Sequence, residues 1–449
     1  MESPRGEYSQ ELEESLRRRG VTLLIGSVID PAGIARAKTV PIGRLASFVR
    51  SGMGASPSWN VFCIDDNIAF TDRLHVEGDL RVRLDPGALA VVADGIAWAP
   101  AEFTEQDGAP CPLDTRTRLR DVCAGLAADG FEALAGCELE FTLFDLQGRV
   151  APWSAYGLAP VLGGPESGFL KDLVALAEQV GLPIEQLHAE YGYRQFEVSL
   201  APTDPLRAAD NAILARLLIG QAAARHGLRP SFSPLSAEGA NAANGAHEHF
   251  SLTRGGVPLL SGGDGPYGIT TDGLAAVAGV LRRLPEFLGF YAGSLLSPHR
   301  LLPGHWSGAH LAWGLENRET AVRYCAATAG NPHGASLELK PNDASANPYL
   351  SLAALLWSAH EGIRDHLAAP PPLTGNPNAP QQTEAEAPTT LPHTQADILK
   401  ALAASDAAAA FAGPDILQAL LAVRRHELDA YATTPLAEIA ERFRYAWSV

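Results

Sequence analysis

Cysteine is scarce in this sequence, and no apolar run is long enough to cross a membrane. The five cysteines among 449 residues lie far apart and form no Cys-x-x-Cys pair. Such spacing is typical of reduced thiols and argues against a disulfide framework or a zinc site. The first 20 residues are charged and lack the apolar centre of a signal peptide. No uninterrupted run of about 18 apolar residues occurs. These absences predict a cytoplasmic protein without a membrane span.

Positive charge is also in short supply. The chain has 34 lysine and arginine residues against 51 aspartate and glutamate residues, a net charge of -17, and no dense basic run. Binding to nucleic acid or to an anionic lipid surface by counterion release is therefore not expected. The excess of carboxylates has two interpretations that composition leaves open, namely solubility and metal ligation.

Two widespread nucleotide-binding motifs are missing as well. No Gly-x-x-x-x-Gly-Lys-Ser/Thr sequence occurs, and no Gly-x-Gly-x-x-Gly follows a predicted strand. If the protein uses ATP, it does so without a P-loop or a Rossmann turn.

What is present indicates a globular chain of two or more domains. Hydrophobic residues make up 46% of it, enough for a large core. β-rich runs at 21–30 and 34–42 flank a turn, which predicts a hairpin, and another strand near 88–98 is broken at Asp94-Gly95. A mostly β region over about 20–110, followed by alternating strands and helices, predicts an α+β fold.

Helix signals follow this β-rich start. Asp114 and Ser167 are predicted N-caps of helices over 114–130 and 167–181, and Asp204-Pro205 opens a helix to about residue 227. Further helices are predicted over 272–293, 346–367, 394–403, 414–431 and 435–446. The segment 370–392 holds seven prolines in 23 residues, which predicts a surface loop.

Four strand-like segments place carboxylates or imidazoles on one face. If each segment is a strand, alternate residues share a face and leucine or phenylalanine occupies the other. The candidate residues are Glu138, Glu140, Glu190, Glu197, His247, His249, Ser251 and Glu338. Each segment alone has another explanation, because two glutamates on a strand also occur at a solvent-exposed edge and a His-x-His sequence also occurs by chance. Together they suit hard divalent cations such as Mg²⁺ or Mn²⁺, and five carboxylates exceed the need of one ion.

Arginines complete this set of candidates. Arg318 and Arg323 lie close together in Asn-Arg-Glu-Thr-Ala-Val-Arg, and Arg300 follows Ser-Pro-His. Guanidinium groups suit phosphate and carboxylate oxygens, although any one of them also fits an ordinary surface ion pair. Side-chain chemistry alone thus predicts a two-metal enzyme of phosphoryl transfer or hydrolysis.

From about residue 20 onward the chain resembles the type I glutamine synthetase family in the order and spacing of several motifs. These are Glu138-Leu139-Glu140-Phe141, His188-Ala189-Glu190 with Gln195-Phe196-Glu197, Asn244-Gly245-Ala246-His247-Glu248-His249-Phe250-Ser251, Arg300-Leu301-Leu302-Pro303-Gly304, Asn317-Arg318 with Arg323, and Glu338 before Asp343-Ala344-Ser345-Ala346-Asn347-Pro348-Tyr349-Leu350. The most similar branches make γ-glutamyl amides of polyamines or ethanolamine.

The resemblance implies a fold and an assembly. After an N-terminal extension over 1–19, a small β-grasp domain is expected over 20–112. A larger catalytic domain with a curved antiparallel sheet and helices is expected over 113–449. Members of the family are usually dodecamers of two stacked hexameric rings, with active sites between neighbouring subunits.

The resemblance also implies ligands and roles. ATP and two or three Mg²⁺ (or Mn²⁺) ions are expected, with glutamate and an amine as substrates. One ion would lie at Glu140, Glu190 and Glu197, and a second at Glu138, His247 and Glu338. The other implied roles are nucleotide binding by His249, Ser251 and Arg323, catalysis by Arg318, Arg323 and Glu338, and substrate binding by Arg300, Lys340, Asn244 and Gly245.

Several positions depart from the family pattern. Ammonia-using members carry a glutamate where this chain has Trp306, and no acidic latch occurs at 56–60. An indole suits an alkyl amine or its ammonium head, so Trp306 is expected to bind an organic amine. Where the family has a lysine and an arginine near the nucleotide, this chain has His333 and Ser336. Where the family has an arginine that helps to bind the substrate glutamate, this chain has Lys340.

These departures leave three functions open. The sequence favours an ATP-dependent ligase that joins the γ-carboxylate of glutamate to an organic amine through γ-glutamyl phosphate. The alternatives are an ammonia-using glutamine synthetase and a catalytically silent, nucleotide-binding regulator of the same fold.

Overall fold

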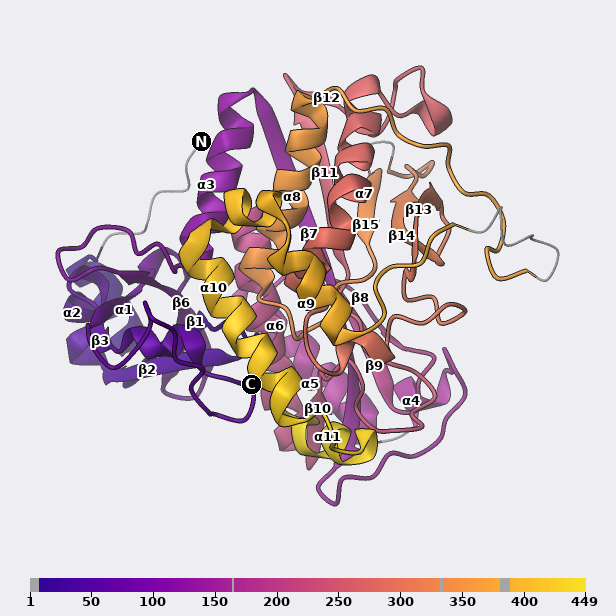
Figure 1. Ribbon diagram of the computed structural model, residues 1–449. Helices are drawn as coiled ribbons and strands as arrows, with labels where there is room; N and C mark the ends of the chain where they lie inside the picture. Colours follow the sequence, from indigo (N-terminus) through magenta and orange to yellow (C-terminus); the bar gives the residue numbers. More distant parts are fainter. Residues whose placement is uncertain (1–7, 164, 332–333, 380–387) are drawn as a thin grey trace.

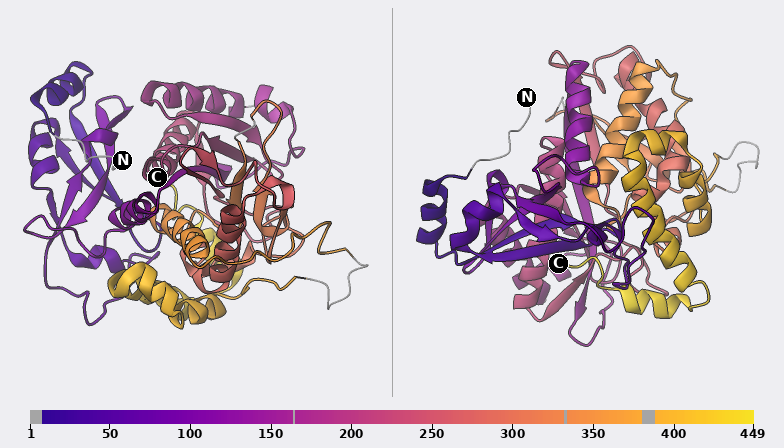
Figure 2. Two further views of the ribbon diagram at one scale, coloured as in Figure 1. Left: turned by 90° about the horizontal axis from the view of Figure 1, so that it is seen from above. Right: turned by 60° about the vertical axis from the view of Figure 1, so that its left-hand side comes forward.

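Two β-sheets organise the chain (Figure 1). The computed structural model describes residues 8–163, 165–331, 334–379 and 388–449. A six-stranded sheet uses strands up to Thr104, and a nine-stranded sheet uses strands from Phe131 onward. The smaller sheet lies to one side of the larger, helix-covered part (Figures 1 and 2). The predicted α+β fold, with a small N-terminal sheet before a larger catalytic part, is confirmed. The domain boundary at residue 112 itself stays a prediction.

The smaller sheet has the order β2-β1-β6-β4-β3, with β5 paired to β6. The predicted hairpin forms, since β1 pairs antiparallel with β2. The strand predicted near 88–98, broken at Asp94-Gly95, is present as β5 and β6, which also pair antiparallel, while β1 and β6 run parallel. The elements are α1 Gln10–Arg18, β1 Leu23–Ile29, β2 Ala35–Pro41, η1 Ile42–Arg44, α2 Leu45–Arg50, β3 Met53–Ala55, η2 Pro57–Val61, β4 Leu80–Leu84, η3 Pro86–Ala88, β5 Ala90–Ala93 and β6 Ile96–Thr104.

Helix α1 was not predicted. Ser9 caps it, but Leu16 is its one buried residue.

The larger sheet has the order β13-β14-β15-β11-β7-β9-β8. Its strands are β7 Phe131–Asp145, β8 Ile184–Ala189, β9 Gln195–Leu200, β10 Leu228–Ser231, β11 Glu248–Arg254, β12 Val257–Pro258, β13 His310–Leu315, β14 Thr320–Cys325 and β15 Ser336–Leu339. All pairs are antiparallel except β13 with β14. The long β7 pairs with β11 along its first half and with β9 along its second, and so spans the sheet.

Helices pack against this sheet, and α6, α7 and α8 are buried along most of their length. Asp114 and Asp204 cap α3 and α6 as predicted. The predicted N-cap at Ser167 is wrong, because α5 begins two residues earlier at a proline, a favoured first helical residue. The helices are α3 Thr115–Ala128, α4 Ala159–Leu162, α5 Pro165–Val180, α6 Pro205–Arg225, η4 Pro266–Gly268, α7 Thr271–Tyr291, η5 Ser297–His299, α8 Pro348–Arg364, α9 Gln395–Ala403, α10 Asp406–Ala430 and α11 Leu436–Phe443.

Helix α10 connects the two parts of the molecule. Its Ala419 and Val423 belong to the apolar core of the smaller sheet, whereas Phe411 belongs to the main core. The helix begins earlier than the predicted residue 414, and the backbone breaks at Gly413 (φ 73°, ψ 163°).

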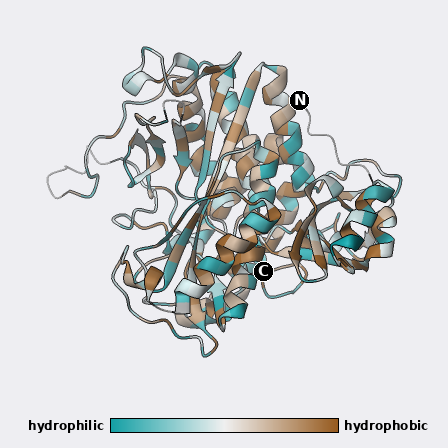
Figure 3. Cartoon of the chain, turned by 180° about the vertical axis from the view of Figure 1, so that it is seen from behind, coloured by the Kyte–Doolittle hydropathy of each residue, from teal (hydrophilic) through white to brown (hydrophobic). Residues whose placement is uncertain are grey.

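By length and composition, α10 is the one helix of the described chain that could cross a membrane. Half of its most apolar stretch is buried against the rest of the protein, and hydrophobic and hydrophilic residues alternate along the helices and strands (Figure 3). Its buried Arg424–Glu427 ion pair also indicates a core helix.

Candidate active site

Strand alternation on β7 exposes two carboxylates on one face of the larger sheet. Leu139 and Phe141 are buried in the core, so Glu138 and Glu140 point to the opposite face. The register then places Glu140 directly across from Glu197 of β9. Two carboxylates at one cross-strand position repel each other unless a cation or a proton lies between them.

The strands on the other side of β7 from β9, namely β11, β15 and β14, add imidazole and guanidinium groups. Glu338 of β15 lies across from His249 of β11 and from Arg323 of β14. His247 directly precedes β11 and is fixed through its carbonyl oxygen, which accepts the amide hydrogen of Glu138 at 2.9 Å. Five strands, β7, β9, β11, β14 and β15, thereby contribute to one charged patch.

One group of three potential metal ligands lies at the centre of this patch. The Nδ1 atom of His247 is 3.3 Å from Glu138 Oε2 and 3.4 Å from Glu338 Oε1. Ligand atoms of the three side chains all lie within 4.8 Å of one another, as ligands of one ion would. The structure thus brings together the three residues predicted for the second metal.

Two further groups of ligand atoms share Glu197. One consists of Glu140, Glu197 and His247, with His247 Nε2 3.9 Å from Glu140 Oε1. The other consists of His188, Glu190 and Glu197, with His188 Nε2 3.1 Å from Glu190 Oε1 and 3.8 Å from Glu197 Oε1.

The set predicted for the first metal is therefore divided between these two groups. Glu197 lies in both, Glu140 in one and Glu190 in the other. His188, for which sequence reasoning gave no role, stands beside Glu190. Its signal was available, because His188 lies two residues before Glu190 at the end of a strand.

Electrostatics shows an excess of negative charge around Glu197. Burial and the charges of nearby carboxylates, first Glu138 and then Glu140, raise the pKa of Glu197 to about 9. A carboxyl group that must take up a proton near neutral pH marks a place where a cation is favourable. Carboxylate oxygens with imidazole nitrogens are donors that Mg²⁺ and Mn²⁺ accept, so these residues fit divalent cations.

Glu338 is a buried carboxylate whose charge is strongly compensated by its neighbours. Burial alone would raise its pKa, but the charge of Lys340 and then of the two histidines lowers it to about 2. Lys340 Nζ is 3.0 Å from Glu338 Oε1, and both side chains are buried. Burial of Glu138 is likewise outweighed by hydrogen bonds from His247 and His249, which hold its pKa well below the ordinary value.

Glu140 is held in place by a second layer of polar groups. Its Oε2 accepts the amide hydrogen of Gly245 at 2.6 Å and faces Gln195 Nε2 at 3.4 Å. The Gln195 amide also donates to Asn244 Oδ1 at 3.0 Å. Asn244 is 1% exposed and donates to the carbonyl oxygens of Ser231 and Ser233. The side chain of Asn244, predicted to bind substrate, thus braces the patch, and Gln195 is a further bracing residue that the prediction lacked.

Arg300 lies beneath the patch and is 4% exposed. It donates to the carbonyl oxygens of Pro341 (3.1 Å) and Lys340 (2.9 Å), and lies 3.0 Å from His247 Nε2. A Cβ atom at Gly245 would come within 2.6 Å of the Arg300 guanidinium and 2.5 Å of His247. Glycine is therefore required at 245 for this close approach.

The two predicted phosphoryl-binding arginines differ in setting. Arg323 is fixed between Glu338, whose Oε2 it approaches to 3.1 Å, and Glu316. Arg318 is exposed, and within the described chain it forms no ion pair. One arginine is therefore rigid and the other is available to an anionic ligand.

Two of the predicted nucleotide-binding residues, His249 and Ser251, lie on β11. His249 Nε2 is 3.4 Å from Glu138 Oε1, and its Nδ1 is 3.3 Å from Ser336 Oγ. Burial would lower the pKa of His249, but hydrogen bonds with Cys325 and Glu138 raise it well above the ordinary value. Ser251 is half-buried two residues further along the strand. His333 lies outside the described residues.

Two aromatic side chains on loops, Trp306 and Tyr156, are exposed. Trp306 is 54% exposed and has a left-handed backbone, with φ 54°. Tyr156, which sequence reasoning missed, is 55% exposed and stacks on His188 with ring centroids 6.0 Å apart. Such surfaces suit an alkyl chain or an ammonium group.

Two other places in the described chain could suggest ligand binding. Cys63, Asp65 and His426 lie within metal-ligand distance of one another, but Asp65 Oδ2 already accepts hydrogen bonds from His426 (3.1 Å) and Tyr431 (3.0 Å). This second cluster is explained as a structural contact.

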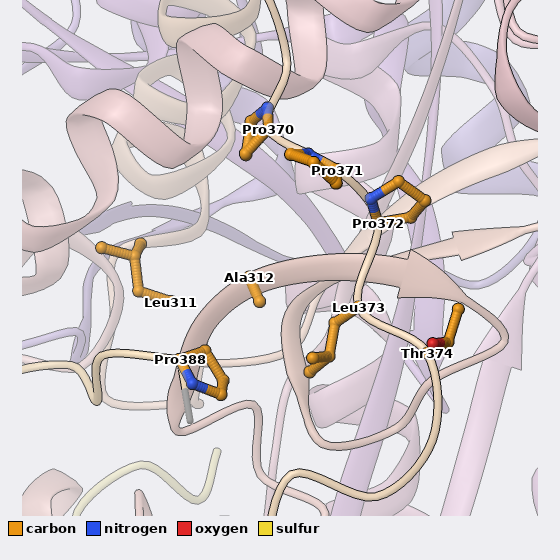
Figure 4. Close-up of a pocket in the computed structure, with 8 residues that line it drawn as sticks. All are labelled: Leu311, Ala312, Pro370, Pro371, Pro372, Leu373, Thr374 and Pro388. Atoms are coloured by element: carbon orange, nitrogen blue, oxygen red, sulfur yellow. The ribbon is translucent and has the colours of Figure 1, made fainter. Parts of the chain in front are cut away.

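A groove of about 520 Å³ lies between β13 and the proline-rich segment (Figure 4). It is lined by Leu311, Ala312, Pro370, Pro371, Pro372, Leu373, Thr374 and Pro388. None of these side chains titrates, so the groove offers no group for acid–base or metal chemistry.

Comparison with known proteins identifies the family of the chain. The model of the family "Glutamine synthetase, catalytic domain" matches residues 112–442. A γ-glutamylpolyamine synthetase of Streptomyces coelicolor is 36% identical over 98% of this chain and 97% of its own length. A glutamine synthetase of Methanosarcina mazei is 26% identical over 82% of this chain and 81% of its own length.

Solved structures show the same fold. The crystal structure of a novel glutamine synthase homolog superposes with a TM-score of 0.85 at 32% identity, over 96% of this chain and 99% of that one. A structure titled "GmaS/ADP complex" superposes with a TM-score of 0.83 at 23% identity, over 97% and 99%. The chain belongs to the glutamine synthetase family of carbon–nitrogen ligases.

Proposed function

We propose that this protein is an ATP-dependent ligase that joins the γ-carboxylate of glutamate to an organic amine. The observation that carries the proposal is the patch of five glutamates and His247. Trp306, at the sequence position where ammonia-using members carry a glutamate, supports an organic amine. Similarity to a γ-glutamylpolyamine synthetase along nearly the whole chain supports a polyamine rather than ethanolamine.

Glu138, His247 and Glu338 would hold one divalent cation, and Glu140, Glu190 and Glu197 another. His188 is close enough to assist the second group. When bound, two or three Mg²⁺ (or Mn²⁺) ions would neutralise the phosphates of ATP.

The chain's own residues would then orient the reacting groups. His249 and Ser251 bind the nucleotide, and Arg323 and Arg318 receive the transferred phosphoryl oxygens. Glu338 holds Arg323 at 3.1 Å and Lys340 at 3.0 Å, so one carboxylate aligns two cations. Arg300 and Lys340, together with the Asn244-Gly245 backbone, form the side toward the acid substrate.

The proposed reaction has two steps. The γ-carboxylate oxygen of glutamate attacks the γ-phosphorus of ATP, the bond to ADP breaks, and γ-glutamyl phosphate forms. The amine nitrogen then attacks the carbonyl carbon of the acyl phosphate, phosphate leaves, and the nitrogen loses a proton. Arginine donors aimed at the phosphoryl oxygens stabilise the charge that develops in both steps.

The family's usual assembly and the scattered cysteines, whose spacing is typical of reduced thiols, support two further proposals. We infer a homo-oligomer, a dodecamer of two hexameric rings, and a cytoplasmic location. Small molecules are the expected partners, with no nucleic acid or membrane.

Phosphate release from ATP with glutamate and Mg²⁺ tests this function. The panel contains ammonium, ethanolamine, putrescine and spermidine, and the mass of each product is measured. Release only with an organic amine, giving its γ-glutamyl amide, is the expected result. Phosphate release with ammonium alone would favour the ammonia-using glutamine synthetase, whose reaction would use the same metal ligands. If ATP binds but no amine of the panel leads to phosphate release, the nucleotide-binding regulator is favoured.

A further inference from the structure

The loop that carries Trp306 needs an anchor outside itself. Residues 302–306 are exposed, and both Gly304 (φ 83°) and Trp306 (φ 54°) have left-handed backbones. For a bulky residue such as tryptophan this conformation costs roughly 1–2 kcal/mol, so the surrounding structure must hold it.

Glu319 supplies this anchor. Its side chain is 6% exposed. One carboxylate oxygen accepts the amide hydrogen of Trp306 at 3.0 Å, and the other accepts that of Gly304 at 3.0 Å. Among the described residues Glu319 forms no ion pair, so N–H dipoles alone stabilise its charge. A buried carboxylate with these hydrogen bonds fixes the backbone of the loop.

A third donor connects the anchor to the proline-rich segment. Asn378 donates its side-chain amide to Glu319 at 3.0 Å, and its oxygen lies 3.0 Å from His310 Nε2. The same segment also binds Asn317, whose side-chain amide donates to the carbonyl oxygen of Gly375 at 3.0 Å. Residues 317–319 are thereby braced on both sides, and Arg318 lies between the two braced residues.

We propose that Glu319 is a positioning residue for amine specificity, because it fixes the Trp306 loop relative to Arg318. This inference rests on the proposed function. The indole can offer a fixed face to an alkyl ammonium group only while its backbone is held. Glutamate and ATP would contact other residues, so loss of the anchor affects the amine selectively.

Glu319→Gln is the direct test. The amide keeps the size of the side chain but turns one acceptor into a donor, which faces a backbone N–H. The KM for the best organic amine is expected to rise about tenfold, the loss of one charge-assisted hydrogen bond. The KM values for ATP and glutamate should stay within about twofold. Glu132→Gln, the same change at an exposed position of β7, is the matched control.

Hydrogen exchange supplies a readout that does not depend on turnover. The amide hydrogens of Gly304 and Trp306 should exchange faster in Glu319→Gln than in the wild type. Asn378→Ala removes one donor to Glu319 and should give a smaller effect of the same kind, which keeps the proposal testable if Glu319→Gln does not fold.

Unchanged exchange at Gly304 and Trp306 would overturn the anchor. A parallel rise in all three KM values would overturn its selectivity. If the wild-type enzyme turned over no organic amine, the proposed function would fail and amine specificity with it. Faster exchange in Glu319→Gln would in that case still uphold the anchor.

Discussion

Glu338 shows at the residue scale how one side chain serves several others. It lies 3.0 Å from Lys340 Nζ, 3.1 Å from the Arg323 guanidinium and 3.4 Å from His247 Nδ1. The alternating pattern of β15 predicted which way Glu338 points. It did not predict that the positive groups around it would lower its pKa to about 2, because those contacts depend on which strands become neighbours.

Removal of one carboxylate from the patch separates an enzyme from a silent relative. Glu140→Ala should weaken Mg²⁺ binding at least about tenfold and turnover about a hundredfold, because the patch loses a ligand next to Glu197. Calorimetric titration with Mg²⁺ and a phosphate-release assay measure the two effects. Glu132→Ala on the same strand should leave both unchanged. Full activity in Glu140→Ala would contradict the proposed metal ligands.

Cation binding should release a proton. The pKa of Glu197, raised to about 9 by burial and neighbouring carboxylates, keeps its carboxyl protonated at neutral pH in the cation-free protein. A cation requires the ionised form, so its affinity should increase as pH rises toward 9. Titrations with Mg²⁺ at pH 7 in two buffers of different ionisation enthalpy measure this proton. Identical heats in both buffers would show that no proton is released.

At the element scale, local chemistry predicted most boundaries. Asp114 and Asp204 begin their helices as N-caps, and the Asp94-Gly95 turn separates β5 from β6. The pattern failed where structure depends on distant partners. Helix α10 begins before the predicted residue 414 because the part that precedes the break at Gly413 buries Phe411 in the main core, and parallel β13–β14 pairing has no local signature.

The crossing of α7 and α8 depends on two glycines in contact. A Cβ atom at Gly362 would lie 2.2 Å from the carbonyl oxygen of Ala275 and 2.6 Å from the Cα atom of Gly279. Gly362→Ala should therefore destabilise the protein by roughly 1–3 kcal/mol, because two buried backbones would have to separate.

Gly125 is the matched position, since it is exposed on α3 and a Cβ there would meet nothing within 4 Å. Gly125→Ala should stabilise by about 0.5–1 kcal/mol through helix propensity. Thermal unfolding of both variants measures the difference. A similar melting temperature for the two would refute close packing at the crossing.

At the scale of the whole molecule, contacts between distant segments join the two sheets. Asp65 in a loop of the N-terminal part accepts hydrogen bonds from His426 and Tyr431 near the C-terminus. Arg116 of α3 pairs with Glu102 of β6 and Asp210 of α6, all buried. Sequence predicted the two parts and their order, but these pairings span up to 366 positions and could not be read from local patterns.

The Asp65 contact should make stability depend on pH. Burial alone would raise its pKa, but hydrogen bonds from His426 and Asn67 lower it to about 2. A folded pKa below the unfolded value of about 3.9 stabilises the fold above pH 4, and this contribution disappears as pH falls toward 2.

Asp65→Asn should therefore lose about 1–2 kcal/mol of stability at pH 7 and almost none near pH 2. Urea unfolding at several pH values measures the difference, with Asp94→Asn in an exposed turn as control. A loss independent of pH would assign the effect to packing instead of charge.

The central claim is that this molecule activates glutamate as an acyl phosphate and transfers it to an organic amine. Mass spectrometry of one reaction tests it, with glutamate labelled by ¹⁸O in its γ-carboxylate and with ammonium and putrescine competing in equal amounts. The predicted result is phosphate that carries one labelled oxygen, together with γ-glutamylputrescine and little glutamine. Unlabelled phosphate, or glutamine as the main product, would contradict the account.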